Sequence, residues 1–192
     1  MLISERVRLR PLEREDLKEV VRWFNDPATR ALLARSSPLS LAEEERWFDA
    51  LLSSTTEVVF AIEETTSSTP RLIGSCGVHR IDWRHRNAAV GIVIGDVNDR
   101  GHGLGTEAMA TLVRHCVQDL GLYRVELEVI SDNASALSSY ERCGFVPEGT
   151  RRGALFKDGR FVDLVLMSIL ATAVLQLPVG VAPPKRTPKK TR

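Results

Sequence analysis

The segment RGHGLGT, residues Arg100 to Thr106, lies between an apolar strand-like run and a long helical pattern. Gly101, Gly103 and Gly105 leave its backbone without Cβ atoms, so a ligand can approach closely. The first turn of a helix has amide N–H groups without partners and a partial positive charge, both of which attract anions. The segment therefore predicts a strand–loop–helix unit that binds a phosphate group, with a tight turn without ligand as the alternative.

Two common phosphate-binding loops do not account for this segment. A P-loop needs a lysine after its last glycine, and none follows here. Residues 103–108 fit the dinucleotide fingerprint, and Glu126 or Glu128 lies about 20 residues further on. However, fewer than half of the residues remain after Ala108, and they end in a hairpin pattern instead of further βαβ units. Position therefore argues against a dinucleotide-binding fold.

The remaining periodicity predicts one α/β domain over residues 1–172 with a mostly antiparallel sheet. Asp158-Gly159, between two alternating runs, is a strong hairpin signal, and Pro27 ends the helix before it. Alternating or apolar runs predict strands over residues 4–12, 57–64, 71–81, 87–95 and 123–130, and a hairpin over residues 150–170. Helical spacing predicts helices over residues 13–25, 40–52, 104–120 and 133–144.

The end of the chain differs in composition from the rest. Five basic residues and no acid stand in the last ten positions, whereas 21 basic and 25 acidic residues precede them. A Pro/Lys/Thr-rich segment buries too little apolar surface to order itself. We therefore predict a flexible basic tail over residues 173–192, either simply solvated or in contact with ribosome or nucleic acid.

Composition points to a cytoplasmic protein. No apolar run reaches the roughly 18 to 20 residues of a membrane span, and charges occupy the N-terminal stretch where a secretory signal is apolar. Cys76, Cys116 and Cys143 form an odd set without CxxC spacing. Such cysteines indicate free thiols in a reducing compartment and no metal site.

The glycine loop is followed by further matching residues: Asn133-Ala134, then Tyr140, then Cys143-Gly144-Phe145. With Arg100-x-x-Gly103-x-Gly105 and the terminal FKDGRFVDLVLMSIL, this sequence resembles the GNAT superfamily of acetyl-CoA-dependent N-acetyltransferases from about Ile3 to Leu170. VRLRPLEREDL, WFNDP and DGRFVDLVLMSIL resemble the branch that holds ribosomal-protein N-terminal acetyltransferases and spermidine acetyltransferases.

The resemblance implies a central, mostly antiparallel twisted sheet flanked by helices, with acetyl-CoA as co-substrate. It places the coenzyme pyrophosphate on the loop amides, with the charge of Arg100 closing the approach. It also implies that the strand before the loop splays from its neighbour at a bulge, which Gly91 or Gly95 could mark. Asn133 has an alternative role as a helix N-cap. The implied cofactor-binding residues are Ile92, Val93, Ile94, Arg100, Gly101, His102, Gly103, Leu104, Gly105, Thr106 and Asn133.

The resemblance also implies a catalytic residue. Tyr140 matches the general acid that protonates the leaving thiolate, with a core ring as the alternative. A phenol pKa of about 10 lies close enough to a thiol pKa of about 8.5 for this transfer. Spermidine-type relatives place a glutamate at the position of Ala89, which leaves the base unassigned. Candidate bases are Glu126, Glu128, His79, His85 and Asp82.

The implied reaction is direct transfer of acetyl to a primary amine in a ternary complex. The acceptor would be a peptide N-terminus, as in the ribosomal-protein type, or a small amine such as a polyamine, an aminoglycoside or an amino sugar. The helices over residues 13–52 would form the acceptor wall, where Glu43 to Glu45 could attract a cation or simply stabilise a helix start. A homodimer is compatible with this reading. The alternative function is a non-catalytic CoA-sensing or ribosome-associated binding module.

Overall fold

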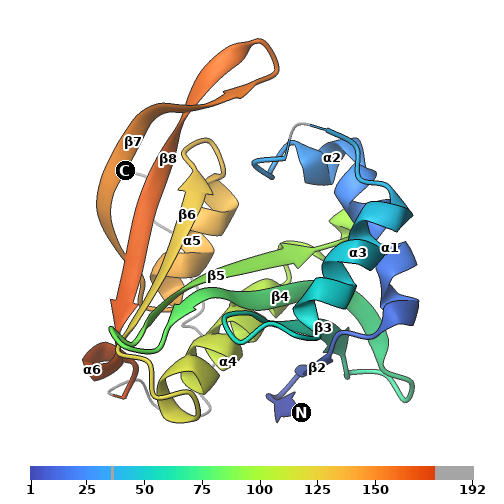
Figure 1. Cartoon of the computed structure of the whole chain (residues 1–192), viewed down its shortest axis with the longest axis horizontal. Coiled ribbons are helices and arrows are strands. Elements are labelled where there is room, and N and C mark those ends of the chain that lie inside the picture. The colour runs from blue at the N-terminus through green and yellow to red at the C-terminus, as the bar shows by residue number, and fades with distance from the viewer. Residues whose placement is uncertain (36, 176–192) are drawn as a thin grey trace, which may run out of the picture.

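Eight strands form one sheet in the computed structural model, which describes residues 1–35 and 37–175 (Figure 1). Their order is β1-β2-β3-β4-β5-β6-β8-β7, and β5 and β6 are the parallel pair in an otherwise antiparallel ladder. The strands are β1 Leu2–Ile3, β2 Val7–Pro11, β3 Val58–Glu64, β4 Arg71–Asp82, β5 Asn87–Ile94, β6 Arg124–Ile130, β7 Val146–Lys157 and β8 Arg160–Leu170.

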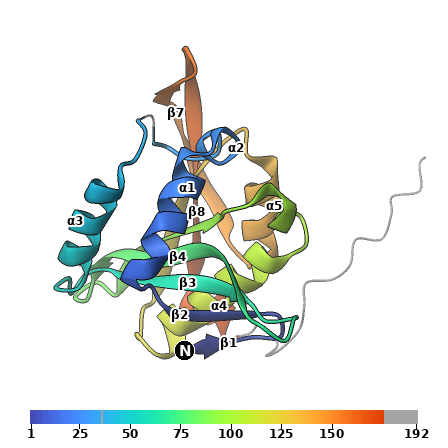
Figure 2. The same cartoon turned by 90° about the vertical axis from the view of Figure 1, so that its right-hand side faces the viewer.

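Helices cover both faces of this sheet (Figures 1 and 2). The long helix α4 packs on one face, where Met109 and Leu112 are fully buried in the main core. Helices α1 and α3 pack on the other face around Trp23 and Phe48, in a second apolar cluster. The helices are α1 Leu17–Asn25, α2 Pro27–Arg30, α3 Leu41–Leu51, α4 Leu104–Gln118, α5 Ala134–Arg142 and α6 Ala171–Val174, with short 3-10 turns at Arg14–Asp16 and Val97–Asp99.

Local sequence signals explain several of these boundaries. Helix α3 starts at a capping box in which the Ser40 side chain accepts from the Glu43 amide and the Glu43 carboxylate accepts from the Ser40 amide. The β7–β8 turn has positive φ at both Asp158 (49°) and Gly159 (78°), as a tight hairpin turn requires. The predicted helix over residues 40–52 and the predicted hairpin are therefore confirmed.

The strand before the glycine loop separates from its neighbour, as the resemblance implied. Strands β5 and β6 pair only from Asn87–Ala89 to Arg124–Glu126 and then diverge (Figure 1). The expectation that Gly91 or Gly95 marks a bulge is wrong. Gly91 pairs in register with Gly77, and the register shift lies between His79 and Asp82, where Arg80 has a φ of 51°. The divergence therefore needs no irregularity in β5 itself.

Gly95 has a packing role instead, because a Cβ there would lie 2.1 Å from Trp23 Cε2. The Trp23 ring is 1% exposed and has no room to move aside. We expect Gly95→Ala to lower the free energy of unfolding by about 1 to 3 kcal/mol, a loss typical of an overpacked core. Thermal denaturation measures this change, and Gly149→Ala is the matched control, since a Cβ there meets nothing within 4 Å. Equal melting temperatures for both variants would contradict the packing argument.

Three elements were not predicted: β1, α2 and α6. Helix α2 begins at Pro27 with Asp26 as its N-cap, so the proline that ends α1 also starts the next turn. Helix α6 crosses the predicted boundary at residue 172, and its Val174 is buried in the main core. The domain thus continues at least to Leu175. The rest of the predicted basic tail lies outside the described residues.

Candidate functional site

A cavity of about 810 Å³ opens where β5 and β6 diverge. We call the part beside α4 and α5 the loop end, which is lined by Gly101, Gly103, Gly105, Thr106, Tyr140 and Arg142. We call the part beside α1 and α3 the helix end, which is lined by Leu12, Phe24, Leu33, Leu39, Glu44 and Trp47. One cavity thus joins the glycine loop to the expected acceptor wall.

The loop end presents unpaired amides at the start of α4. Gly101 and Gly103 have φ values of 80° and 84°, which only glycine adopts at little cost. The first amide that bonds back into the loop is that of Glu107, which donates to the Gly103 carbonyl. Among the described residues, the amides of Leu104, Gly105 and Thr106 have no acceptor. The residues present therefore fit an anionic group such as the coenzyme diphosphate.

The basic residues at the loop end are arranged differently from our expectation. Arg100 directs Nε to the Ile94 carbonyl (3.0 Å) and Nη2 to the Gly95 carbonyl (2.7 Å) and Thr29 Oγ1 (2.6 Å). Arg100 lines the cavity, but these bonds hold its side chain against the end of β5, and a contact of its charge with a phosphate stays a prediction. Arg142, which the sequence analysis missed, lines the cavity and reaches Thr106 Oγ1 at 3.3 Å. Arg142 is therefore the better-placed cation.

Arg6 supports the glycine loop from outside the cavity. Its backbone amide and Nε bind the Glu107 carboxylate, and its Nη1 donates to the His102 carbonyl at 3.0 Å. The His102 side chain is exposed and does not line the cavity, and Leu104 is buried in the main core. The side chains of His102 and Leu104 therefore do not face the cavity, and only their backbones could contact a ligand. This is compatible with the prediction that the loop binds through its amides.

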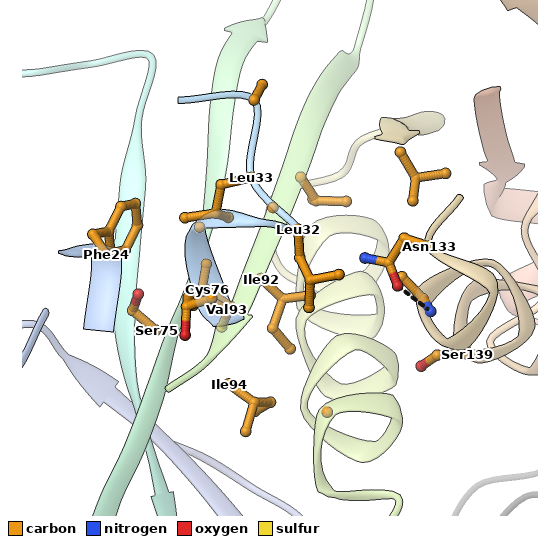
Figure 3. A pocket seen from close by; sticks show the side chains of 18 of the residues that line it. Phe24, Leu32, Leu33, Ser75, Cys76, Ile92, Val93, Ile94, Asn133 and Ser139 are labelled. Carbon is orange, nitrogen blue, oxygen red and sulfur yellow. Dashed lines mark hydrogen bonds between the residues drawn. The ribbon is translucent and has the colours of Figure 1, made fainter. Parts of the chain in front are cut away.

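Strand β5 forms the floor between the two ends. Ile92, Val93 and Ile94 line the cavity, as Figure 3 shows, and they pair with β4 on one edge only. Their other edge faces the gap toward β6. An extended ligand carrying amide groups can pair with such an open edge.

Tyr140 lies on α5 at the loop end and is 9% exposed. Its ring packs against Phe145 at a centroid distance of 5.9 Å. Within the described residues its hydroxyl has no hydrogen-bond partner, although the residue lines the cavity. Burial raises the pKa of Tyr140 to about 12, so its phenol stays protonated at neutral pH.

Asn133 caps α5 and also lines the cavity, so its position is compatible with both of its predicted roles. Its Oδ1 accepts from the Ala136 amide at 3.1 Å, which makes it the N-cap of α5. The same side chain lines the cavity and lies across from Ile92 (Figure 3). The N-cap role is confirmed, and the side-chain nitrogen is left for another partner.

The helix end is largely apolar but holds one buried carboxylate. Glu44 is 8% exposed, and its carboxylate makes no hydrogen bond or close ion pair among the described residues. Burial raises the pKa of Glu44, and the more distant Arg35 opposes that shift. The neighbouring Glu43 instead uses its carboxylate to cap α3 at Ser40. Glu44 is therefore the carboxylate that can receive a cationic ligand.

The β7–β8 hairpin reaches over to the helix end. Lys157 Nζ donates to the carbonyls of Arg30 (2.5 Å) and Leu33 (2.6 Å), at the end of α2. Leu32 and Leu33 follow α2 and line the cavity (Figure 3). The hairpin thus holds the segment that forms this wall.

Only two of the five candidate bases line the cavity. These are His79 on β4 and Glu128 on β6. Asp82 and His85 pair with each other at 2.8 Å on the surface, and Glu126 pairs with Arg124 at 3.1 Å. The last three residues do not line the cavity.

A family model described as the acetyltransferase (GNAT) domain matches residues 6–146. The chain belongs to the GNAT acetyltransferases. A spermidine N(1)-acetyltransferase of Vibrio cholerae is 27% identical over 90% of this chain and 98% of that protein. A ribosomal N-acetyltransferase-like protein of Bacillus subtilis is 32% identical over 52% of this chain and 54% of its own length.

A solved structure gives the same answer for the fold. The crystal structure of spermidine N-acetyltransferase from Vibrio cholerae in complex with CoA and spermine superposes with a TM-score of 0.83 and 27% identity. The superposition covers 89% of this chain and 99% of the Vibrio cholerae chain. The predicted fold and branch are confirmed.

The family membership establishes the activity in general terms. The protein is an acetyl-CoA-dependent N-acetyltransferase that transfers the acetyl group to an amine, and a purely non-catalytic binding module is not favoured. The three cysteines are free and buried, as expected. In residues 1–35 and 37–175, no helix has both the length and the apolar character needed to cross a membrane.

Proposed function

We propose that the acceptor is a small amine with a mostly apolar skeleton and a second cationic group. The buried, unpaired carboxylate of Glu44 on an apolar wall is the observation that carries this proposal. A raised pKa means that ionised Glu44 is costly there, and a cationic ligand would relieve that cost. The reacting amine would lie over β5, with the skeleton against the wall of the helix end.

The few free carboxylates at the helix end favour an acceptor with one further positive charge over an acceptor with several. Glu43 is committed to the cap of α3, and Arg35 lies 3.8 Å from it. Ala89 stands where spermidine-type relatives place a glutamate. A polyamine with three or more charges would therefore find few free carboxylates. Spermidine is nevertheless the second candidate, because several of the relatives that match most of the chain are named as spermidine acetyltransferases.

We propose that the loop end holds the coenzyme. The amides from Gly101 to Thr106 would bind the diphosphate, with Arg142 adding positive charge. The open edge of β5 from Ile92 to Ile94 would pair with the pantetheine arm, and Asn133 would contact it from α5. When bound, acetyl-CoA supplies the activated acetyl group. Tyr140 would protonate the leaving sulfur as general acid.

We expect Glu44→Gln to abolish a preference for diamines. A linear alkyl diamine and the alkyl monoamine of equal length would be compared by thiol release from acetyl-CoA. A hydrogen bond to a charged group is worth about 1.5 to 3 kcal/mol, so kcat/KM for the diamine should fall at least about 10-fold. The monoamine should be affected little, because it carries no second charge.

The neighbouring Glu45→Gln serves as the matched control, because Glu45 does not line the cavity. It should keep the wild-type preference. Spermidine and an N-terminal peptide are tested in the same assay. A wild-type enzyme that acetylates spermidine or the peptide much faster than the diamine would replace the proposed acceptor.

A further inference from the structure

His79 lies on β4 directly opposite Ala89 of β5. Gly77 and Gly91 form the next pair of residues that share this face of the sheet. Neither glycine has a side chain, and Ala89 has only a methyl group. The imidazole therefore lies over a part of the cavity floor that has no large side chains, on the face opposite α4.

The two ring nitrogens of His79 have different surroundings. A Cβ built on Gly77 would lie 2.6 Å from Nε2, and one built on Gly91 would lie 4.0 Å away. Nε2 thus lies over Gly77, on the side toward Gly91. Nδ1 lies 3.8 Å from Oε2 of Glu57, the residue just before β3. This arrangement favours a proton on Nδ1 and a free electron pair on Nε2.

The charged groups around the ring keep it available as a proton acceptor. Burial lowers the pKa of His79, Glu57 raises it and Arg80 lowers it further. Glu128 faces the same side pocket from β6, but its carboxylate binds Arg151 at 2.9 Å. The net pKa lies below the ordinary histidine value of about 6.5, so the imidazole is neutral at pH 7.

We propose that His79, oriented by Glu57, is the general base of the acetyl transfer. This inference rests on the proposed placement of the acceptor amine over β5. His79 Nε2 takes one proton from the bound ammonium, which frees the nitrogen electron pair to bond the acetyl carbon. Tyr140 gives its proton to the sulfur as the C–S bond breaks and recovers the second proton that the new amide nitrogen sheds. The proton on His79 then passes to solvent.

The decisive experiment is the pH dependence of kcat/KM in three enzymes: wild type, His79→Gln and Glu57→Gln. His79→Gln should lower kcat about 100-fold. It should also remove the acid limb of the profile, which is the fall in kcat/KM at low pH as the base becomes protonated. Glu57→Gln removes a charge that raises the pKa of His79, so the limb should move to lower pH while kcat changes much less. NMR titration of the His79 ring in the free protein should give the same pKa as the wild-type limb and the same shift in Glu57→Gln.

Gly77→Ala tests the geometry independently. A methyl group there would displace the imidazole, so kcat should fall although His79 is still present. The matched control is His85→Gln on the surface, which should leave activity and the limb unchanged. CoA affinity, measured by calorimetry, should be unchanged in all variants.

Two results would overturn the assignment. In the first, His79→Gln keeps the acid limb or Glu57→Gln leaves it in place. In the second, Glu128→Gln removes the limb and thereby identifies Glu128 as the base. Failure of the proposed acceptor would look different, because the wild-type enzyme would then be inactive toward the diamine while still turning over another amine.

Discussion

Replacing Tyr140 with phenylalanine is expected to lower kcat by about 10²- to 10⁴-fold, with the affinity for acetyl-CoA nearly unchanged. The substitution removes only the hydroxyl, and the ring keeps its contact with Phe145. Because that hydroxyl has no partner among the described residues, stability should change by less than about 1 kcal/mol. Steady-state kinetics by thiol release and calorimetry with CoA measure the two effects separately.

A pKa of about 12 makes Tyr140 a weaker acid than an ordinary phenol, whose pKa is about 10. A thiolate leaving beside Tyr140 should be desolvated in the same way and become comparably basic. We therefore expect the proton transfer from Tyr140 to the sulfur to stay close to balanced.

The control for this prediction is Tyr123→Phe, which alters an exposed tyrosine outside the cavity. It should keep full activity. If Tyr140→Phe also kept full activity, Tyr140 would be only a core ring. A fall of a few-fold would mean that a water molecule delivers most of the proton.

The sequence predicted the parts of the fold that depend on neighbours along the chain. Ser40 with Glu43, and Asp158 with Gly159, are local signals whose geometry a few residues determine. Helix α2 was missed although Asp26-Pro27 is also a helix start, because proline was interpreted only as a stop. The β5–β6 divergence followed from family resemblance, but its position depends on pairing between distant strands, so the glycines predicted to mark it were wrong.

The same division holds for the candidate site. The glycine loop and Tyr140 could be predicted as site residues because their spacing along the chain is itself the motif. Glu57 and His79 are 22 positions apart and become neighbours only through the β3–β4 register, which the sequence does not reveal. The direction of the Arg100 side chain depends on the Ile94 and Gly95 carbonyls, which the fold places beside it. Tertiary contacts therefore decide which of the predicted residues can act.

Gly103→Val is expected to weaken CoA binding at least 10-fold, equivalent to about 1.4 kcal/mol. Gly103 is the N-cap of α4 with a φ of 84°, where a branched side chain is strained. Gly103 lines the cavity directly before the first-turn amides, so a distorted backbone there would also displace the amides that we propose bind the diphosphate. A Cβ at this position already lies 3.3 Å from Arg6 Nη2, so the loop has little freedom to turn away. Calorimetry with CoA measures the loss.

Backbone strain alone could lower affinity by disturbing the fold, so the control must carry the same strain elsewhere. Gly121 lies just beyond the other end of α4, has a φ of 67° and does not line the cavity. Gly121→Val should therefore lose stability to a similar degree and still bind CoA with wild-type affinity. If a folded Gly103→Val protein bound CoA as tightly as the wild type, the diphosphate would have to lie elsewhere, and Arg142 would lose its proposed partner as well. If both variants lost affinity equally, strain and not contact would explain the effect.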